Sequence, residues 1–345
     1  MPVLALTQGD PAGIGPEIAL KSWLRRDEFA LPFALVGDPA FMRRTSKRLG
    51  LGVPVEAVSL SDAAAAFRRA LPVVPLGIEV EAEPGRPDPA TAAATIRSIE
   101  EAVRLAQTGE VAAVVTNPIA KHVLHAAGFS HPGHTEFLAA LAAAPGRPAP
   151  HPVMMLWCED LAVVPVTVHI PLARVPEALT TDLIVTTGRI VDRDLRERFG
   201  VTKPRLAVAG LNPHAGESGS IGTEDAEIIA PAVAALRREG IDASGPWPAD
   251  TLFHARAREG YDATLAMYHD QALIPIKTIA FDEGVNVTLG LPFVRTSPDH
   301  GTAFDIAGRG VARADSLVAA LRLAARLGAR AAAPAVPAAP AKPAE

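Results

Sequence analysis

The 345-residue chain has one cysteine, Cys158, so it can form no disulfide within itself and no zinc site built from several cysteines. Cys158 follows Met154–Trp157, an apolar run typical of a buried strand, which favours a structural thiol over a reactive one. No window of 18 uncharged apolar residues occurs, and Met1–Gln8 lacks the basic and apolar regions of a signal peptide. The sequence therefore predicts a cytoplasmic protein with no membrane partner.

The chain also lacks an excess of basic charge. It carries 33 basic and 38 acidic residues, a net charge of -5, so no electrostatic footprint for nucleic acid is present. The composition, 49% hydrophobic and 21% charged, is that of a soluble globular protein. The length predicts two lobes that share an interface, with one large domain as the alternative.

Short apolar runs alternate with longer segments of helical period, which predicts parallel strands linked by crossover helices and hence an α/β fold. The expected strands are Val3–Leu6, Phe33–Val36, Val111–Val115, Val153–Leu156, Leu161–Thr167, Arg205–Ala209 and Ala263–Met267. The expected helices are Pro16–Leu24, Ala90–Gln107, Thr135–Ala143, Thr223–Glu239 with a kink or break at Pro231, and a last helix around Ala314–Leu327.

Two segments are expected to be irregular. Pro145–Pro152 contains four prolines and is either a linker or a long loop. The end of the chain, 329–345, is mostly Ala and Pro without a periodic apolar face, so we expect a disordered tail. No internal repeat is evident.

A glycine-rich segment, Gly9–Glu17, joins the first expected strand to a helix. Such a turn can approach an anion, but its glycine spacing differs from the dinucleotide-binding fingerprint, and a tight structural turn explains it equally well. Further along, His134 and Thr135 precede a helix and could present an imidazole, a hydroxyl and backbone amides to a phosphate or carboxylate. Thr135 could instead be a plain helix N-cap.

Three histidines, His169, His214 and His269, stand at or just beyond the ends of expected strands. Ligands gather at strand ends in open α/β sheets, and three neutral imidazoles suit a zinc-like divalent ion while leaving a coordination position open. Their spacing matches no local metal motif, so a structural role remains the alternative for each of them.

Three further polar residues, Lys277, Asn286 and Arg295, lie in apolar or Gly/Pro-rich stretches near the C-terminus. The two cations could clamp a phosphate or carboxylate, with Arg295 binding in bidentate fashion. The alternative is a solvated surface charge. An unpaired charge would be costly if it were buried in such a stretch, which favours the binding role.

Taken together, these segments resemble the 4-hydroxythreonine-4-phosphate dehydrogenase family of pyridoxal phosphate biosynthesis. The resemblance covers Thr7 to about Gly308 and rests on eight blocks in order: Gly9–Glu17, Thr116–Lys121, Gly133–Phe137, His169–Leu172, Leu211–Glu217, Pro248–Phe253, Tyr268–Lys277 and Val285–Asp305. Eight ordered blocks are far more specific than any single one.

The resemblance implies a two-lobed fold similar to isocitrate and isopropylmalate dehydrogenases, with the active site in the cleft between the lobes. We expect a first lobe of 1–130 plus 270–328, and a second lobe of 131–269 that carries metal ligands and dimer contacts. The resemblance also implies that His169, His214 and His269 bind one divalent metal, Zn, Mg, Mn or Co, at a site shared between the subunits of a homodimer. The implied substrate contacts are His134, Thr135, Lys277, Asn286 and Arg295.

The implied reaction is oxidation of 4-hydroxy-L-threonine 4-phosphate by NAD or NADP, with the metal as a Lewis acid at the hydroxyl. The product is a β-keto acid, which loses carbon dioxide to give 3-amino-2-oxopropyl phosphate. Candidates for the general base are Asp250, Lys203 and Asp270, of which Asp250 is preferred, although Asp250 could equally be a helix N-cap.

Other readings of the sequence differ in substrate or class. A dehydrogenase of a sister acid, such as threonate or erythronate 4-phosphate, needs the same metal and phosphate contacts. An enzyme related to phosphate acetyltransferase would use phosphate contacts without a metal. A non-catalytic binding protein on the same scaffold is the third alternative. The set of three histidines favours the dehydrogenase over the last two.

Overall fold

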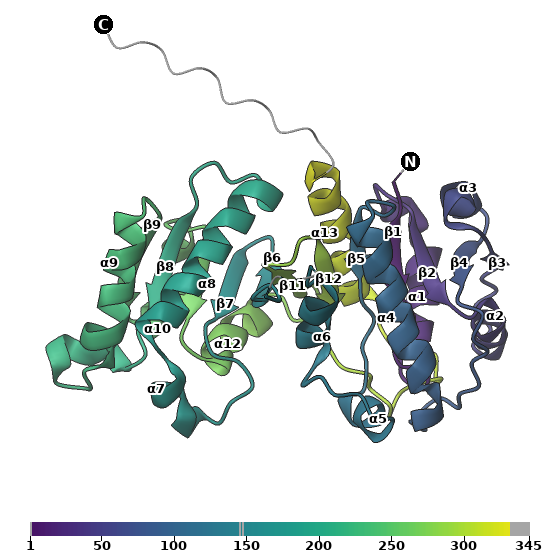
Figure 1. The fold of residues 1–345 in the computed structure, drawn as a ribbon, viewed down its shortest axis with the longest axis horizontal. Coiled ribbons are helices and arrows are strands. Elements are labelled where there is room, and N and C mark those ends of the chain that lie inside the picture. The colour runs from purple at the N-terminus through teal and green to yellow at the C-terminus, as the bar shows by residue number, and fades with distance from the viewer. Residues whose placement is uncertain (1, 145, 147, 332–345) are drawn as a thin grey trace, which may run out of the picture.

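The structure is a computed structural model that describes residues 2–144, 146 and 148–331. These residues form a 12-stranded sheet covered by helices on both faces (Figure 1), which confirms the predicted α/β class. The strands are β1 (Leu4–Thr7), β2 (Phe33–Gly37), β3 (Val55–Ala57), β4 (Leu71–Pro75), β5 (Ala113–Val115), β6 (Val153–Cys158), β7 (Leu161–Pro165), β8 (Arg205–Ala209), β9 (Asp242–Trp247), β10 (Ala263–Ala266), β11 (Val285–Leu289) and β12 (Arg295–Pro298).

Thirteen α-helices of the described residues alternate with these strands along the chain. They are α1 (Gly15–Leu24), α2 (Pro39–Arg48), α3 (Ala63–Ala66), α4 (Ala92–Gln107), α5 (Lys121–Ala126), α6 (His134–Leu141), α7 (Val175–Ala178), α8 (Thr181–Asp194), α9 (Ala230–Arg238), α10 (Ala249–Leu252), α11 (Ala255–Arg258), α12 (His269–Ile279) and α13 (Asp315–Ala331). Two π-helical turns, η5 (Leu195–Phe199) and η7 (Asp225–Ile229), follow α8 and precede α9. The π-helical turn η7 passes directly into α9 with helical backbone angles at Ile229 and Ala230, so the kink or break expected at Pro231 is a change from π to α hydrogen bonding and not an interruption.

The sheet order β3-β4-β2-β1-β5-β12-β11-β6-β7-β10-β8-β9 explains the two lobes. The first six strands in this order, β3-β4-β2-β1-β5-β12, are parallel to one another, and so are the last four, β7-β10-β8-β9. The three central pairings, β12 with β11, β11 with β6 and β6 with β7, are antiparallel. The two parallel groups therefore run in opposite directions and form the halves at right and left of Figure 1, with α13 between them.

The core follows from the alternation of side chains along buried strands. In β1, Leu4 and Leu6 enter a core that also contains residues of α1 and α13 and extends through both lobes, whereas Ala5 enters a second core with α4. Because helices cover both faces, both sets of side chains are apolar. This is why the predicted strands were continuous apolar runs.

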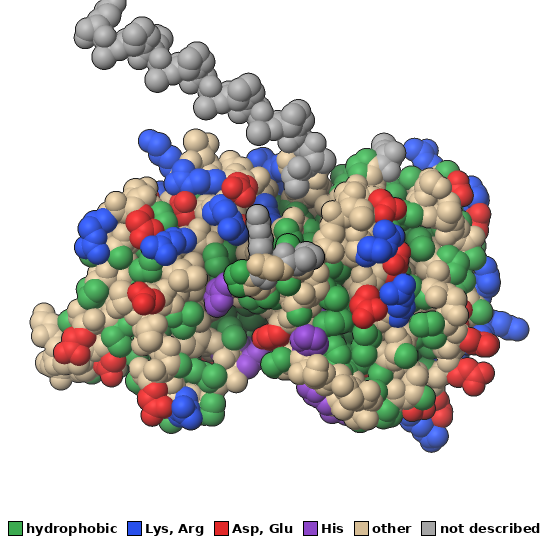
Figure 2. All heavy atoms as spheres, in the orientation of Figure 1, with side chains coloured by type: hydrophobic (Ala, Val, Ile, Leu, Met, Phe, Trp, Pro, Cys, Tyr) green, Lys and Arg blue, Asp and Glu red, His purple; other side chains and the backbone are tan. Residues whose placement is uncertain are grey.

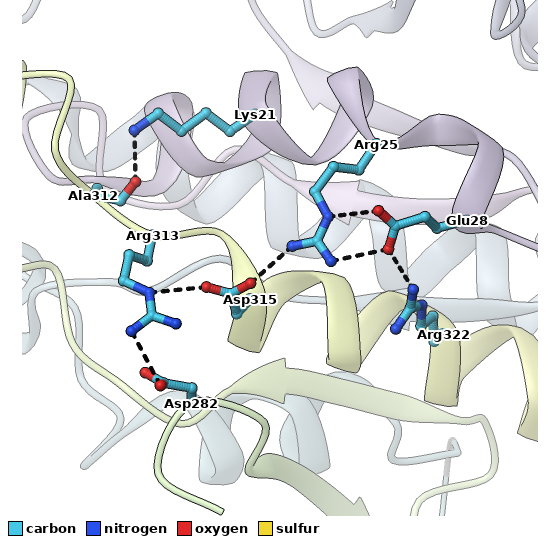
Figure 3. A network of polar contacts seen from close by, with 8 residues as sticks. All are labelled: Lys21, Arg25, Glu28, Asp282, Ala312, Arg313, Asp315 and Arg322. Atoms are coloured by element: carbon cyan, nitrogen blue, oxygen red, sulfur yellow. Dashed lines mark hydrogen bonds and ion pairs between the residues drawn. The ribbon is translucent and has the colours of Figure 1, made fainter.

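A network of ion pairs joins the end of α1, the start of α13 and the loop before β11 in the first lobe (Figure 3). Arg25, which directly follows α1, pairs with Asp315 at the start of α13 at 2.9 Å, and Arg313 pairs with the same carboxylate at 3.0 Å and with Asp282 at 3.1 Å. Exposed pairs of this kind contribute only about 0–1 kcal/mol each. The network therefore orients α13 and the loop before β11 more than it stabilises the fold.

The predicted lobe boundaries at 130/131 and 269/270 stay a prediction. Two helices pack across these predicted boundaries. The apolar residues of α6, which the prediction assigns to the second lobe, pack with those of α4 in the first, and those of α12, which it assigns almost entirely to the first, pack with β6, β7 and β8 in the second. Residues 329–331 of the expected tail are the end of α13, and 332–345 lie outside the described residues. Between α6 and β6, 148–152 have no regular structure, and 145 and 147 are outside the described residues. No described helix is long and apolar enough to cross a membrane.

Candidate functional site

The three predicted metal ligands follow three neighbouring strands. Strands β7, β10 and β8 are adjacent and parallel, and His169, His269 and His214 come a few residues after their respective carboxyl ends. The histidines therefore lie along one edge of the sheet, as ligand residues do in open α/β sheets. Figure 2 shows histidine side chains gathered around the hollow between the two halves of the molecule.

Two of these histidines are close enough to act together. The rings of His169 and His269 have centroids 5.5 Å apart. Burial, with help from the charges of Lys121 and His269, lowers the pKa of His169, so this imidazole is neutral at pH 7. Nδ1 of His269 lies 2.7 Å from Oδ1 of Asp270. Because an ionised carboxylate can only accept, Nδ1 of His269 donates to Asp270, and Nε2 is the ring nitrogen that faces away from this pair.

The third histidine stands apart in its conformation. His214 is exposed and begins a run of five residues, His214–Ser218, that all have left-handed backbone angles. No group of three or more His, Cys, Asp or Glu residues within 2–144, 146 and 148–331 is arranged to hold a metal ion. The metal triad therefore stays a prediction, of which the structure brings together His169 and His269.

A buried cation with no acidic partner among the described residues lies in the first lobe. Arg295 at the start of β12 is 3% exposed, and its guanidinium donates to the hydroxyls of Thr116, at 2.6 and 3.2 Å, and Thr288, at 2.8 Å. No carboxylate among the described residues pairs with it, and burial lowers its pKa to about 10. A buried guanidinium with no acidic partner is suited to an incoming anion.

The N-terminus of α6 contributes to the same anion site. The half-buried His134 begins this helix, and its buried Nε2 has no hydrogen-bond partner among the described residues. Its pKa is well below the usual range because of burial and then of the charges of Arg295 and Lys121. The N-cap is Gly133 and no side chain caps the helix, so Thr135 is not the N-cap that the sequence allowed. No side chain accepts from the first amides of α6, but the carboxylate of Glu136 lies at this helix end, since a Cβ on Gly133 would be 2.7 Å from its Oε2. An incoming anion would therefore have to displace Glu136.

Lys121 is a site residue that the sequence analysis did not single out. A Cβ atom on Gly133 would lie 3.2 Å from Nζ of Lys121, which places the ammonium at the N-terminus of α6. Its charge acts on both His134 and His169. Lys121 thus connects the anion site with the histidine pair. The signal that could have identified it is its place in the block Thr116–Lys121, which also contains the hydroxyl that binds Arg295.

The other two predicted substrate residues are nearby but differ in their surroundings. Nζ of Lys277 on α12 already pairs with Oδ2 of Asp299 at 2.5 Å and donates to the carbonyl of Asp299 at 2.7 Å. Burial raises the pKa of Asp299, and Lys277 opposes that rise. Asn286 is half-buried in the middle of β11, opposite Ser297 of β12. Both residues belong to the elements that join the lobes.

The three candidates for a general base lie in different places. Asp250 is exposed in the first turn of α10, which packs against the segment that carries His214. The N-cap of α10 is Pro248, so Asp250 does not cap it and that alternative is wrong. Asp270 contacts His269. Lys203 precedes β8 and is therefore at the opposite end of that strand from His214.

The glycine-rich segment after β1 is closely packed. Residues 9–15 are all buried, and a Cβ on Gly9 would lie 2.6 Å from Cβ of Asn117 and 2.8 Å from the carbonyl oxygen of Pro118. A Cβ on Gly13 would lie 2.9 Å from the carbonyl oxygen of Thr302. These glycines allow close approach of neighbouring backbone, which supports the structural turn over an open anion cradle.

Comparisons with known proteins agree on one family. A family model described as "Pyridoxal phosphate biosynthetic protein PdxA" matches residues 29–324. The 4-hydroxythreonine-4-phosphate dehydrogenase of Methylorubrum populi is 67% identical over 332 residues, 95% of this chain and 95% of that protein. The crystal structure of the enzyme of that name from Klebsiella pneumoniae is 41% identical, with a TM-score of 0.83 over 95% of this chain and 98% of that one.

A more distant solved structure carries a different name. The terephthalate 1,2-cis-dihydrodiol dehydrogenase of Burkholderia xenovorans is 30% identical, with a TM-score of 0.63 over 94% of this chain and 98% of that one. Dehydrogenases for different substrates thus share this scaffold.

Proposed function

The chain belongs to the PdxA family of pyridoxal phosphate biosynthetic proteins, and from this we propose that it oxidises 4-hydroxy-L-threonine 4-phosphate with NAD or NADP. The expected product, 2-amino-3-oxo-4-phosphooxybutanoate, is a β-keto acid that loses carbon dioxide to give 3-amino-2-oxopropyl phosphate. The single observation that carries the proposal is the buried Arg295, which has no carboxylate partner among the described residues and whose charge acts on His134 at the start of α6.

The anionic end of the substrate is held by residues around the N-terminus of α6. Arg295 and Lys121 supply positive charge, while the first amides of α6, with His134 and Thr135, supply hydrogen bonds. Because His134 is neutral at pH 7, it donates one hydrogen bond without adding a third full charge. Lys277 and Asn286 reach the substrate from the elements that join the lobes.

The reacting end of the substrate faces the histidines. His169 and His269, with His214, would hold a divalent metal (Zn, Mg, Mn or Co), and neutral imidazoles with one free lone pair fit that task. When bound, the metal supplies Lewis acidity at the hydroxyl and the nicotinamide accepts the hydride. Asp250 takes the hydroxyl proton in this proposal, since α10 packs against the segment of His214.

We also infer that the active enzyme is a homodimer that works in the cytoplasm and shares its active site between subunits. Large apolar side chains are exposed at Leu172, in the segment that follows His169, and at Ile274 and Phe281, in and after the helix that begins at His269. Exposed large apolar side chains in the segments of two candidate ligands favour a contact with another protein surface.

The main alternative is a sister substrate, threonate or erythronate 4-phosphate. Its carbon skeleton and phosphate would make the same contacts. The acyltransferase alternative is not supported, because relatives up to 67% identical are dehydrogenases by name. The names of the same relatives, which are enzymes, also argue against a non-catalytic binding protein.

The test is to follow NADH formation with 4-hydroxythreonine 4-phosphate, then to repeat it after chelator treatment and after restoring Zn, Mg, Mn or Co. Turnover that is lost with the chelator and regained with a metal supports the proposal. Parallel assays with threonate and erythronate 4-phosphates separate the substrates. Activity on one of these alone would reject the assignment to 4-hydroxythreonine 4-phosphate.

A further inference from the structure

Two threonines hold the buried guanidinium of Arg295 from both sides of its strand. Thr288 lies on β11, next to β12 on one side, and Thr116 directly follows β5, next to β12 on the other. Nη1 of Arg295 donates to Oγ1 of Thr288 at 2.8 Å, while Nη2 and Nε both donate to Oγ1 of Thr116, at 2.6 and 3.2 Å. Both threonines are 1% exposed, so water does not compete for these hydrogen bonds.

The register of the three strands produces this arrangement. Residues directly opposite each other on neighbouring strands share one face of the sheet, and Arg295 lies opposite both Thr288 and Val114. Thr116 is two residues beyond Val114 and therefore belongs to the same face. Val114 packs in the core that also contains Phe137 of α6. The two hydroxyls thus meet the guanidinium on the face of the sheet that α6 covers.

These contacts leave one edge of the guanidinium free. An arginine side chain has five N–H donors, of which the threonines take three, one each from Nε, Nη1 and Nη2. The two that remain are one on each terminal nitrogen. A pair of N–H groups on the two terminal nitrogens is a fork that binds a carboxylate or a phosphate in bidentate fashion.

The two acceptors are also neutral, so they do not cancel the charge that they hold. Burial alone lowers the pKa of Arg295 to about 10, which leaves the side chain protonated at pH 7. Arg198 shows the other arrangement, since it lies 3.6 Å from the carboxylate of Asp194. A carboxylate in place of either threonine would pair with Arg295 and compete with an incoming anion.

We infer that Thr116 and Thr288 are positioning residues of the anion site, which hold the guanidinium of Arg295 through neutral oxygens and leave its charge and its terminal fork to the substrate. The inference rests on the proposed function, since it takes Arg295 as the residue that binds the anion. It adds to that function two residues that act through Arg295 and do not themselves touch the substrate in this role.

The test compares a carboxylate with a neutral side chain of nearly the same size at one position. Thr288→Asp places an acid beside Arg295, and Thr288→Asn places an amide there. The probe is inorganic phosphate, whose Kd is measured by calorimetry on the full-length protein without substrate or NAD. We expect phosphate to bind Thr288→Asp about tenfold or more weakly than Thr288→Asn, because the acid takes the charge of Arg295. Equal phosphate affinities of the two folded variants would overturn the inference.

Thr288→Val is a second test, which brings no charge into the core. It removes the hydroxyl that holds Nη1, so we expect the phosphate Kd to rise about tenfold, and Thr288→Ser should restore the affinity of the parent. The matched control is Thr296→Val, since Thr296 is a buried residue of the same sheet whose hydroxyl donates to the carbonyl of Ala320 at 2.9 Å. The control should bind phosphate as the parent does. A folded Thr288→Val protein with the phosphate affinity of the parent would also overturn the inference.

A parallel Arg295→Met protein separates a failure of this inference from a failure of the proposed function. If Arg295→Met loses phosphate affinity while Thr288→Asp and Thr288→Asn bind phosphate equally, the positioning role alone is wrong. If Arg295→Met binds phosphate as the parent does, Arg295 does not bind the anion, and the anion site of the proposed function fails together with the inference.

Discussion

Replacing Arg295 by methionine should leave the unliganded protein as stable as the parent or slightly more stable. Its pKa of about 10 corresponds to a penalty on the order of 3 kcal/mol for the buried charge, at about 1.4 kcal/mol for each tenfold change in protonation. Against this gain, the buried hydroxyls of Thr116 and Thr288 lose a donor, which costs about 1 kcal/mol each. The balance is a change of about 1 kcal/mol or less.

Arg198 is the comparison because it is a largely buried arginine, with a side chain 12% exposed, that has a carboxylate partner. It lies 3.6 Å from Asp194, which is fully buried, and donates to the carbonyls of Leu291 and Phe293. Arg198→Met leaves the carbonyls of Leu291 and Phe293 without their donor, while Asp194 keeps its pair with Arg193 at 2.8 Å, and the variant should lower the free energy of unfolding by about 2 kcal/mol. The contrast between the two variants distinguishes a binding arginine from a structural one.

The assay is urea unfolding of the parent and both variants, with and without 4-hydroxythreonine 4-phosphate. A ligand at a hundredfold excess over its Kd stabilises a protein by about 2.7 kcal/mol. The parent should show that gain, and Arg295→Met should lose most of it. If Arg295→Met destabilised the unliganded protein as much as Arg198→Met does, or kept the full ligand effect, Arg295 would be a structural residue.

Three further predictions concern other residues of the site. Lys121→Met should raise the KM at least tenfold with a smaller change in kcat, whereas Lys121→Arg should retain most of the affinity; an unchanged KM in initial-rate assays would remove Lys121 from the anion site. The pKa of His134 is lower folded than unfolded, so the parent should lose stability as pH falls below about 6.5, where only the unfolded chain gains the proton. Urea unfolding at pH 7 and 5 should show a smaller loss for His134→Gln, and an equal loss would contradict the shift. Asp250→Asn should lower kcat more than tenfold without changing bound zinc; full activity would exclude Asp250 as the base.

Much of the sheet could be predicted because its strands are buried on both faces. The observed β8 has the predicted limits, and β1, β2, β5, β6, β7 and β10 differ from them by one to two residues at an end. The edge strands β3 and β9 were missed, since β3 has only three half-buried or exposed residues and β9 contains Gly245 and Pro246. Strands β4, β11 and β12 were missed as well, β4 because Pro72 and Pro75 interrupt its short apolar run, and β11 and β12 because polar residues such as Asn286 and Arg295 interrupt theirs.

The site was predictable to the extent that its chemistry is visible in residue types. Histidines after strand ends indicated a ligand edge, and the order β7-β10-β8 puts those ends side by side. Sequence could not show that Arg295 has no carboxylate partner among the described residues, nor that Lys277 has one in Asp299. Such pairings depend on tertiary neighbours far apart in the chain. Lys121 was overlooked for the same reason, since only folding brings it to Gly133.

The position of the anion site follows from how the chain crosses between the lobes. Asn286 and Arg295 lie on the hairpin β11–β12, which carries the chain back from the second lobe to the first. The turn of that hairpin is fixed by the second lobe, where Asp194 accepts from the amide of Gly290 at 2.8 Å and Arg198 donates to Phe293 at 2.8 Å. A shift of the second lobe therefore displaces residues that bind substrate in the first. Arg198→Met should accordingly raise the KM of the folded protein as well as lower its stability, and an unchanged KM would show that the hairpin holds its position without this contact.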